Sequence, residues 1–239
     1  MSLKEQFILN FIEDSRWKYL LGGLGNTLLI AFFAVLMGVA IGIVVAMIRS
    51  TYDKNRETLE RRKGFGYYIF TVVNAICKIY LTVVRGTPVV VQLLIAYFLI
   101  FQSSTNGVMV ASIAFGINSG AYVAEILRGG IMSIDNGQFE AGRSLGFNYV
   151  QTMTYIIIPQ VFKTVLPTLL NEFIALLKET SIAGYVGIKD LTKAGDIIRG
   201  RTFSAFMPLL AVAAVYLLLV MFLTFIVSRL ERRLRKNER

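Results

Sequence analysis

The positions of charged residues divide the chain into long apolar stretches separated by short polar ones. The ranges 19–48, 86–124 and 202–228 contain no charged residue. A helix needs about 20 apolar residues to cross the core of a bilayer, and these ranges lack the two-residue alternation of barrel strands. We therefore expect an all-α polytopic membrane protein, with spans near 22–48, 108–127 and 205–228. The first range is too long for a signal-peptide core, so we expect it to be retained.

The apolar stretch 66–102 contains Lys78 and is interrupted by the sequence Arg85-Gly86-Thr87-Pro88. We expect residues 66–84 to form a partly interfacial helix that bends at Gly86 and Pro88 into a span near 88–102. A separate sixth span remains open as an alternative.

The stretch 152–177 is apolar but contains Lys163, Glu172 and two prolines, Pro159 and Pro167. Charged residues inside a span are costly and usually face protein or a water-filled cavity. We expect a kinked span lined by protein, which brings the total to about five spans in a single membrane domain over 1–239.

Basic residues gather in the loop 49–65 and in the tail after residue 228. Lysine and arginine are enriched in cytoplasmic loops, so we expect both segments inside, the N-terminus outside and the C-terminus inside. The segment 178–204 then lies outside although it carries five basic residues. A packed or re-entrant element there would relieve this conflict.

Composition narrows the class of protein further. The chain is 55% hydrophobic and 17% charged, with a net charge of +10. The cytoplasmic placement of the basic segments explains this charge without a nucleic-acid partner. The chain has no histidine and a single cysteine, Cys77, which excludes a histidine-based triad or metal site, an internal disulfide and a cysteine cluster. No Gly-x-x-x-x-Gly-Lys-Ser/Thr sequence is present, so we expect no ATPase site, no cofactor and no metal in this chain.

Small residues recur every fourth position in two of the expected spans. Such stripes let two helices approach closely, either inside one subunit or across a dimer seam. They are Ala34, Gly38, Gly42 and Ala46 in the first, and Ser112, Gly116, Gly120 and Ala124 in the other.

A polar segment at 133–146 predicts a short helix between two spans. Asp135 suits the N-cap, Gln138 lies at the capping-box position, and Gly146 suits the residue after the helix end. We expect a cytoplasmic helix over 136–146, which by itself is compatible with a mere connector.

The same segment carries a recognisable pattern. Glu140-Ala141-Gly142, then Gly146, then Ile156-Ile157-Ile158-Pro159 resembles the EAA signature of ABC importer permeases, with Gly142 in place of alanine and Ile158 in place of leucine. The sequences Arg85-Gly86-Thr87-Pro88 with Gln92, and Lys178-Glu179-Thr180-Ser181, resemble the subgroup that imports polar amino acids, with Glu179 in place of aspartate.

The resemblance implies a permease subunit with a MetI-like fold in a prokaryotic inner or plasma membrane. It also implies two ATP-binding subunits that hold ATP and Mg, a second permease subunit (identical or homologous) and an extracellular or periplasmic amino-acid-binding protein. Transport would proceed by alternating access. The segment 136–146 would be the coupling helix, which contacts the ATPase through Glu140, Ala141, Gly142, Arg143 and Gly146.

Polar residues near the fourth span are candidates for substrate binding. An amino acid needs an acceptor for its ammonium group and a donor for its carboxylate. Asn171 and Glu172 suit the first role, and Lys178, Thr180, Ser181 or backbone amides suit the second. The alternative is that Glu172 pairs within the bundle, with Lys178 or Arg85.

The break at residues 85–88 is a candidate gating or structural element, through Arg85, Gly86 and Pro88, unless Arg85 only snorkels to the interface. Glu125 and Arg128 should form a local pair. Two rival functions remain: a secondary transporter or channel that is not coupled to ATP, and a membrane scaffold without a pathway.

Overall fold

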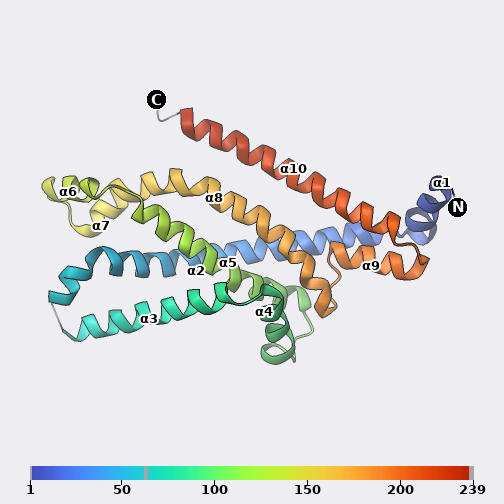
Figure 1. Ribbon diagram of the computed structural model, residues 1–239, viewed down its shortest axis with the longest axis horizontal. Coiled ribbons are helices and arrows are strands. Elements are labelled where there is room, and N and C mark those ends of the chain that lie inside the picture. The colour runs from blue at the N-terminus through green and yellow to red at the C-terminus, as the bar shows by residue number, and fades with distance from the viewer. Residues whose placement is uncertain (1, 62–63, 237–239) are drawn as a thin grey trace. The chain divides into compact units, whose positions relative to one another are not determined.

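The computed structural model describes residues 2–61 and 64–236, and every regular element in these ranges is helical (Figure 1). This confirms the all-α class. The long helices are α2 (Trp17–Arg61), α3 (Phe65–Gly86), α5 (Gly107–Met132), α8 (Ile158–Glu179) and α10 (Phe206–Lys236). The shorter ones are α1 (Leu3–Phe7), α4 (Val89–Ile95), α6 (Asn136–Ser144), α7 (Tyr149–Thr152) and α9 (Leu191–Thr202). The basic residues Arg62, Lys63 and Arg239 lie outside the described residues.

Five segments are long and apolar enough to cross a membrane, the number that the sequence predicted. They are Trp17–Asn55, Phe65–Gly86, Gly107–Met132, Tyr149–Val186 and Phe206–Leu234. Val89–Ile100 forms a shorter apolar helix. The interfacial placement of 66–84 stays a prediction.

The predicted break between α3 and α4 is confirmed. α3 ends at Gly86 and α4 begins at Val89. Thr87 has φ −120° and ψ 146°, the extended conformation that a following proline imposes on its neighbour. Pro88 therefore ends the helix through its effect on Thr87.

Contacts divide the chain into two compact units. The first comprises Met1–Leu36, Val89–Gly116 and Phe173–Arg229, and the second comprises Met37–Pro88, Ile117–Glu172 and Leu230–Arg239. Each is described by itself below. That the whole chain forms a single domain stays a prediction.

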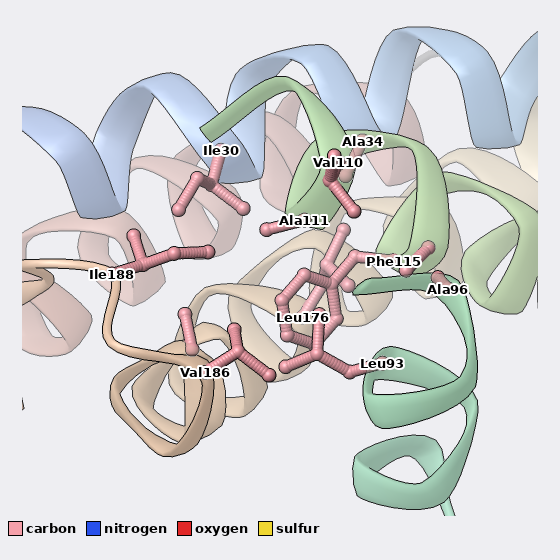
Figure 2. Packing of buried hydrophobic residues seen from close by; sticks show 12 residues of the cluster. Ile30, Ala34, Leu93, Ala96, Val110, Ala111, Phe115, Leu176, Val186 and Ile188 are labelled. Carbon is pink, nitrogen blue, oxygen red and sulfur yellow. The ribbon is translucent and has the colours of Figure 1, made fainter. Parts of the chain in front are cut away.

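The first unit is built around a cluster of apolar side chains from α2, α4, α5 and α8 (Figure 2). Ile30, Leu93 and Phe115 are completely buried, and Leu176 is 1% exposed. Ala34 and Ala111 lie in the same cluster. Because small side chains let helices approach, the large ones can fill the space between them.

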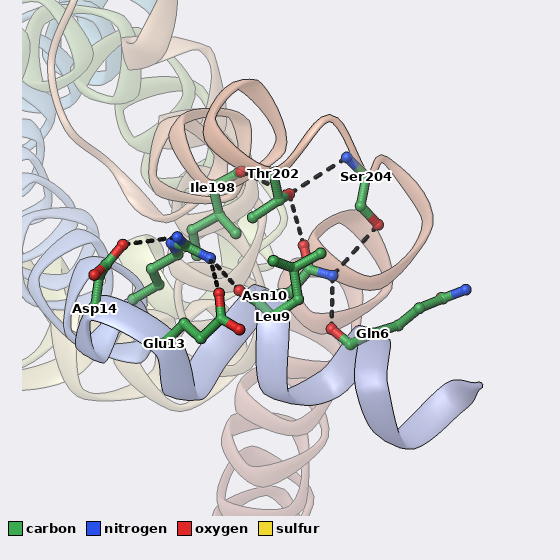
Figure 3. A network of polar contacts seen from close by, with 9 residues as sticks. Gln6, Leu9, Asn10, Glu13, Asp14, Ile198, Thr202 and Ser204 are labelled. Atoms are coloured by element: carbon green, nitrogen blue, oxygen red, sulfur yellow. Dashed lines mark hydrogen bonds and ion pairs between the residues drawn. The ribbon is translucent and has the colours of Figure 1, made fainter. Parts of the chain in front are cut away.

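The N-terminal segment before α2 is also tied to the first unit (Figure 3). The buried Asn10 donates from Nδ2 to the Gln6 carbonyl at 2.8 Å, and its Oδ1 accepts from the Thr202 hydroxyl at 2.8 Å. Asn10 Nδ2 also lies 3.3 Å from Ser204 Oγ. The segment thus packs against the end of α9.

In the second unit the small-residue stripes bring α2 and α5 together. A Cβ atom added at Gly42 would lie 2.4 Å from Val123 Cγ1, and one at Gly38 would lie 2.8 Å from Ser119 Oγ. One at Gly120 would lie 2.9 Å from Ile41 Cγ2. The stripes therefore serve close packing inside one chain.

Candidate functional site

The short helix predicted from the polar segment is α6 of the second unit. Asp135 caps it, since its Oδ1 accepts from the Gly137 amide at 2.6 Å. Gln138 does not complete a capping box with Asp135, because its Oε1 accepts from the Gln160 side chain at 3.4 Å. The N-cap at Asp135 is thus confirmed. Gln138 connects α6 to α8 instead of closing a capping box.

The end of α6 follows the predicted pattern. The Gly146 amide donates to the Arg143 carbonyl at 2.9 Å, and the Phe147 amide donates to the Gly142 carbonyl at 3.0 Å. This is a Schellman motif, which needs a residue with positive φ after the helix. Gly146 has φ +82°, a conformation that glycine adopts without a steric penalty.

One face of α6 is held by its own chain. Phe139 and Gly142 are buried, and the Lys54 Nζ lies 4.6 Å from the centre of the Phe139 ring. Lys54 also donates to Asn136 Oδ1 at 2.7 Å. A Cβ at Gly142 would lie 2.7 Å from both Thr152 Cγ2 and Thr152 Oγ1. The end of α2 and the end of α7 thus fix the position of α6.

The other face of α6 is exposed. Four of the five residues expected to contact an ATPase lie there: Glu140, Ala141, Arg143 and Gly146. Gly142 is the exception, since it faces Thr152. Two exposed apolar residues stand beside them, Leu145 (71% exposed) and Val150 (69% exposed). The sequence reasoning passed over both, although a leucine and a valine in a polar segment are a readable signal of a contact surface.

The residues after α6 lead directly into α8. Asn148 and Gln151 form a capping box at the start of α7, with both hydrogen bonds at 2.9 Å. A π turn, Met153–Ile157, comes just before Pro159, and Pro167 lies inside α8. The predicted kink in this span stays a prediction.

Arg85 belongs to an ionic chain in the second unit. Its guanidinium lies 3.7 Å from Glu125 Oε2, and Glu125 Oε1 accepts from Arg128 at 2.6 Å. The expected local pair of Glu125 and Arg128 is therefore present. Arg128 continues to Asp53 at 3.3 Å, and Arg49 lies 3.7 Å from the same carboxylate. Arg85 thus joins α3 to α5, beside the break at Gly86 and Pro88.

The proposed substrate residues fall into two groups. Asn171 and Glu172 belong to the second unit, where Asn171 is exposed and Glu172 is half-buried. Lys178, Thr180 and Ser181 belong to the first. The completely buried Thr180 donates its hydroxyl proton to the Leu177 carbonyl at 2.7 Å. It is therefore already engaged as a donor, unlike the exposed Lys178.

Ser181 opens onto a cavity of about 490 Å³ in the first unit. Lys193, Asp196 and Arg199 of α9 line the same cavity. Asp196 accepts from Lys193 Nζ at 3.0 Å and from Arg199 Nε at 2.9 Å. These hydrogen bonds, the one from Arg199 first, lower the pKa of the Asp196 carboxyl.

α9 is a packed element within 178–204, the segment for which the basic residues led us to expect a packed or re-entrant element. Its residues Leu191, Ala194 and Ile198 are buried. Asp190 caps it through hydrogen bonds of 3.0 Å from the Thr192 and Lys193 amides, and the Thr27 hydroxyl accepts from the Leu191 amide at 3.1 Å. Burial raises the pKa of the Asp190 carboxyl, and the amide hydrogen bonds oppose this shift. Sequence reasoning missed both Thr27 and Asp190.

Metal-ligating side chains are not gathered anywhere in the described ranges: no group of three or more of His, Cys, Asp and Glu lies close enough to hold an ion.

Comparison with known families identifies one family over most of the chain. The model of the family described as "binding-protein-dependent transport system inner membrane component" matches residues 64–236. The putative glutamine transport system permease protein of Rickettsia typhi is 34% identical over 222 residues, which cover 92% of this chain and 94% of that protein. The arginine transport system permease protein of Bacillus subtilis is 34% identical over 223 residues, covering 92% and 94%.

Solved structures agree with the sequence relatives. A crystal structure of an amino acid ABC transporter with histidines superimposes with a TM-score of 0.79 at 36% identity, over 93% of this chain and 98% of that one. A methionine ABC transporter in inward-facing conformations gives a TM-score of 0.73 over 98% and 99% of the two chains. At 17% identity the second match supports the fold alone.

Proposed function

From the premise that this chain belongs to the family of binding-protein-dependent transport system inner membrane components, we propose that it is the permease subunit of an ATP-driven importer for polar amino acids. Relatives described as glutamine and arginine permeases, matched over nine-tenths of the chain, support this substrate class. The observation that carries the proposal is α6. It is capped at both ends and fixed on one face, and it presents Glu140, Ala141, Arg143 and Gly146 on the other.

α6 is the coupling helix in this proposal. One of two ATPase subunits, each holding ATP and Mg, would dock against its exposed face. The carboxylate of Glu140 would pair with a basic group of the ATPase, and Leu145 and Val150 would supply apolar contact. Because Lys54, Phe139 and Thr152 fix α6 to neighbouring helices, its displacement would move those helices with it. That motion would open the transport pathway alternately to the two sides of the membrane.

The remaining partners follow from the same proposal. A second permease subunit, identical or homologous, completes the pathway, and an extracellular or periplasmic binding protein delivers the amino acid. The N-terminus lies outside and the C-terminus lies in the cytoplasm. The packing of α9 supports this orientation, because it removes the objection raised by the basic residues of 178–204.

Within the pathway, Asn171 and Glu172 would receive the ammonium group of the substrate. Lys178, Ser181 and backbone amides would receive its carboxylate, while Thr180 would act through the local structure because its hydroxyl proton is engaged. Arg85, Gly86 and Pro88 would form a gating or structural element between α3 and α4.

Reconstitution tests the function directly. The full chain is placed in vesicles with its ATPase and binding protein, and uptake of labelled glutamine and arginine is measured. We expect uptake that requires ATP hydrolysis. Uptake that persists without the ATPase supports a secondary transporter or channel, and no uptake under any condition supports a scaffold.

The role of α6 is tested in the same vesicles. Glu140→Lys should abolish the stimulation of ATP hydrolysis by the binding protein while the chain still inserts and folds. Gln138→Ala is the matched control, because Gln138 lies on the same helix but contacts Gln160 of its own chain. Equal stimulation in both variants would contradict the assignment.

A further inference from the structure

A basic cavity lies within the second unit, apart from α6 and from the proposed substrate residues. Its volume is about 480 Å³, and it is an open cavity lined by α2, α3 and α5. Four cations line it, namely Arg49, Lys78, Arg85 and Arg128, together with a single carboxylate, that of Glu125.

The ionic chain around the cavity leaves it positively charged. Glu125 is shared between Arg85 and Arg128, and Asp53 is shared between Arg49 and Arg128. Four cations thus face two carboxylates. Among the side chains that the structure describes, no carboxylate lies within ion-pair distance of Lys78. Guanidinium groups and an ammonium group that line one cavity, with no carboxylate paired to the ammonium group, are suited to an anion such as a phosphate.

Apolar surface adjoins these charges. On α3, which carries Lys78 and Arg85, the side chains of Ile76, Ile79 and Val83 are 60%, 63% and 55% exposed. A free anion makes no use of such a surface, whereas a lipid combines a charged headgroup with acyl chains. Basic pockets between membrane helices on the cytoplasmic side bind anionic headgroups, and the basic loop after α2 predicts that side for Arg49.

We propose that this cavity binds the phosphate of an anionic phospholipid. The phosphate oxygens accept from Lys78 Nζ and from the Arg85 guanidinium, and the acyl chains lie along the apolar side of α3. Arg128 keeps Glu125 engaged at 2.6 Å, which limits repulsion between that carboxylate and the phosphate. The lipid is not transported, so the site adds a structural ligand to the proposed function.

Lipid retention by the purified full chain tests the site. Native mass spectrometry measures the affinity for added phosphatidylglycerol in the unaltered chain, in Lys78→Gln and in Lys163→Gln. Removing one cation near an anionic lipid should weaken binding about fivefold, so we expect this loss for Lys78→Gln alone. Lys163 is the matched control, an exposed lysine on α8 that does not line the cavity. Equal affinities in all three proteins would overturn the proposal.

A second variant separates charge from folding. Lys78→Arg keeps the positive charge and should retain the original affinity, whereas a loss as large as that of Lys78→Gln would overturn an electrostatic site. Thermal unfolding of each variant shows that the chain remains folded.

Competitors identify the source of the phosphate. Phosphatidylcholine and inorganic phosphate should fail to displace phosphatidylglycerol. Displacement by inorganic phosphate would show a site for free anions, and displacement by glutamine or arginine would show a substrate site; either result overturns the lipid assignment. The measurement needs neither ATPase nor uptake, so its failure and the failure of the proposed function are distinguishable.

Discussion

Gly142→Ala changes Glu140-Ala141-Gly142 into the Glu-Ala-Ala of the family pattern, yet we expect it to harm this chain. The new Cβ would lie 2.7 Å from two atoms of Thr152, a branched side chain with little rotamer freedom. Overpacking a close contact costs about 1–3 kcal/mol, while alanine gains about 1 kcal/mol over glycine inside a helix. The expected net loss in the free energy of unfolding is therefore up to about 2 kcal/mol.

Thr152→Ala supplies the compensating change. It removes both atoms that the new methyl group meets, including a buried hydroxyl oxygen with no hydrogen-bond partner in the described part of the chain. In that background Gly142→Ala should stabilise the chain by about 1 kcal/mol. The coupling energy between the two sites would then be about 1–3 kcal/mol.

Thermal or denaturant unfolding of the two single variants and the double variant measures this coupling. The stimulation of ATP hydrolysis by the binding protein should follow the same order, because Gly142 positions the exposed face of α6. Gly129→Ala is the control, since an added Cβ there meets nothing within 4 Å. If Gly142→Ala has the same effect with and without Thr152, the close-packing argument is wrong.

Three further predictions concern the N-terminal segment, α9 and the face of α6. Asn10→Ala breaks the hydrogen bond from Thr202 and should cost about 1–3 kcal/mol, visible as faster proteolysis before α2. Asp190→Asn keeps an N-cap acceptor. Because burial raises the pKa of Asp190, the native chain loses stability as the pH rises above about 4. The stability of Asp190→Asn should therefore fall less with rising pH, as measured by unfolding at several pH values. A fall as steep as that of the unaltered chain would contradict this prediction. Leu145→Ser should leave stability within about 0.5 kcal/mol but weaken ATPase binding by about 1–2 kcal/mol in a direct binding assay.

Sequence alone predicted the features that depend on local chemistry. Long apolar stretches, three of them within charge-free ranges, predicted the five crossing segments, Pro88 predicted the break after α3, and Asp135 and Gly146 predicted the two ends of α6. Each of these depends on a few neighbouring residues, so each is readable from the chain.

Features that depend on distant residues were not predictable in this way. Thr27 bonds an amide that lies 164 positions further along the chain, and Asn10 meets Thr202 across 192 positions. The inward orientation of Gly142 depends on Thr152, which belongs to the next helix. Residue types suggested a coupling surface, but the fold decides which members of the signature are exposed.

The start of α9 has a consequence for any carboxylate that passes it. The first four amides of a helix normally lack partners and attract anions. Here all four are occupied: the Asp190 amide donates to the Ile188 carbonyl at 2.9 Å, the Leu191 amide donates to the Thr27 hydroxyl, and the Thr192 and Lys193 amides donate to the Asp190 carboxylate. If the transport pathway that we propose runs past this helix, its start would therefore hold the carboxylate of a passing amino acid only weakly.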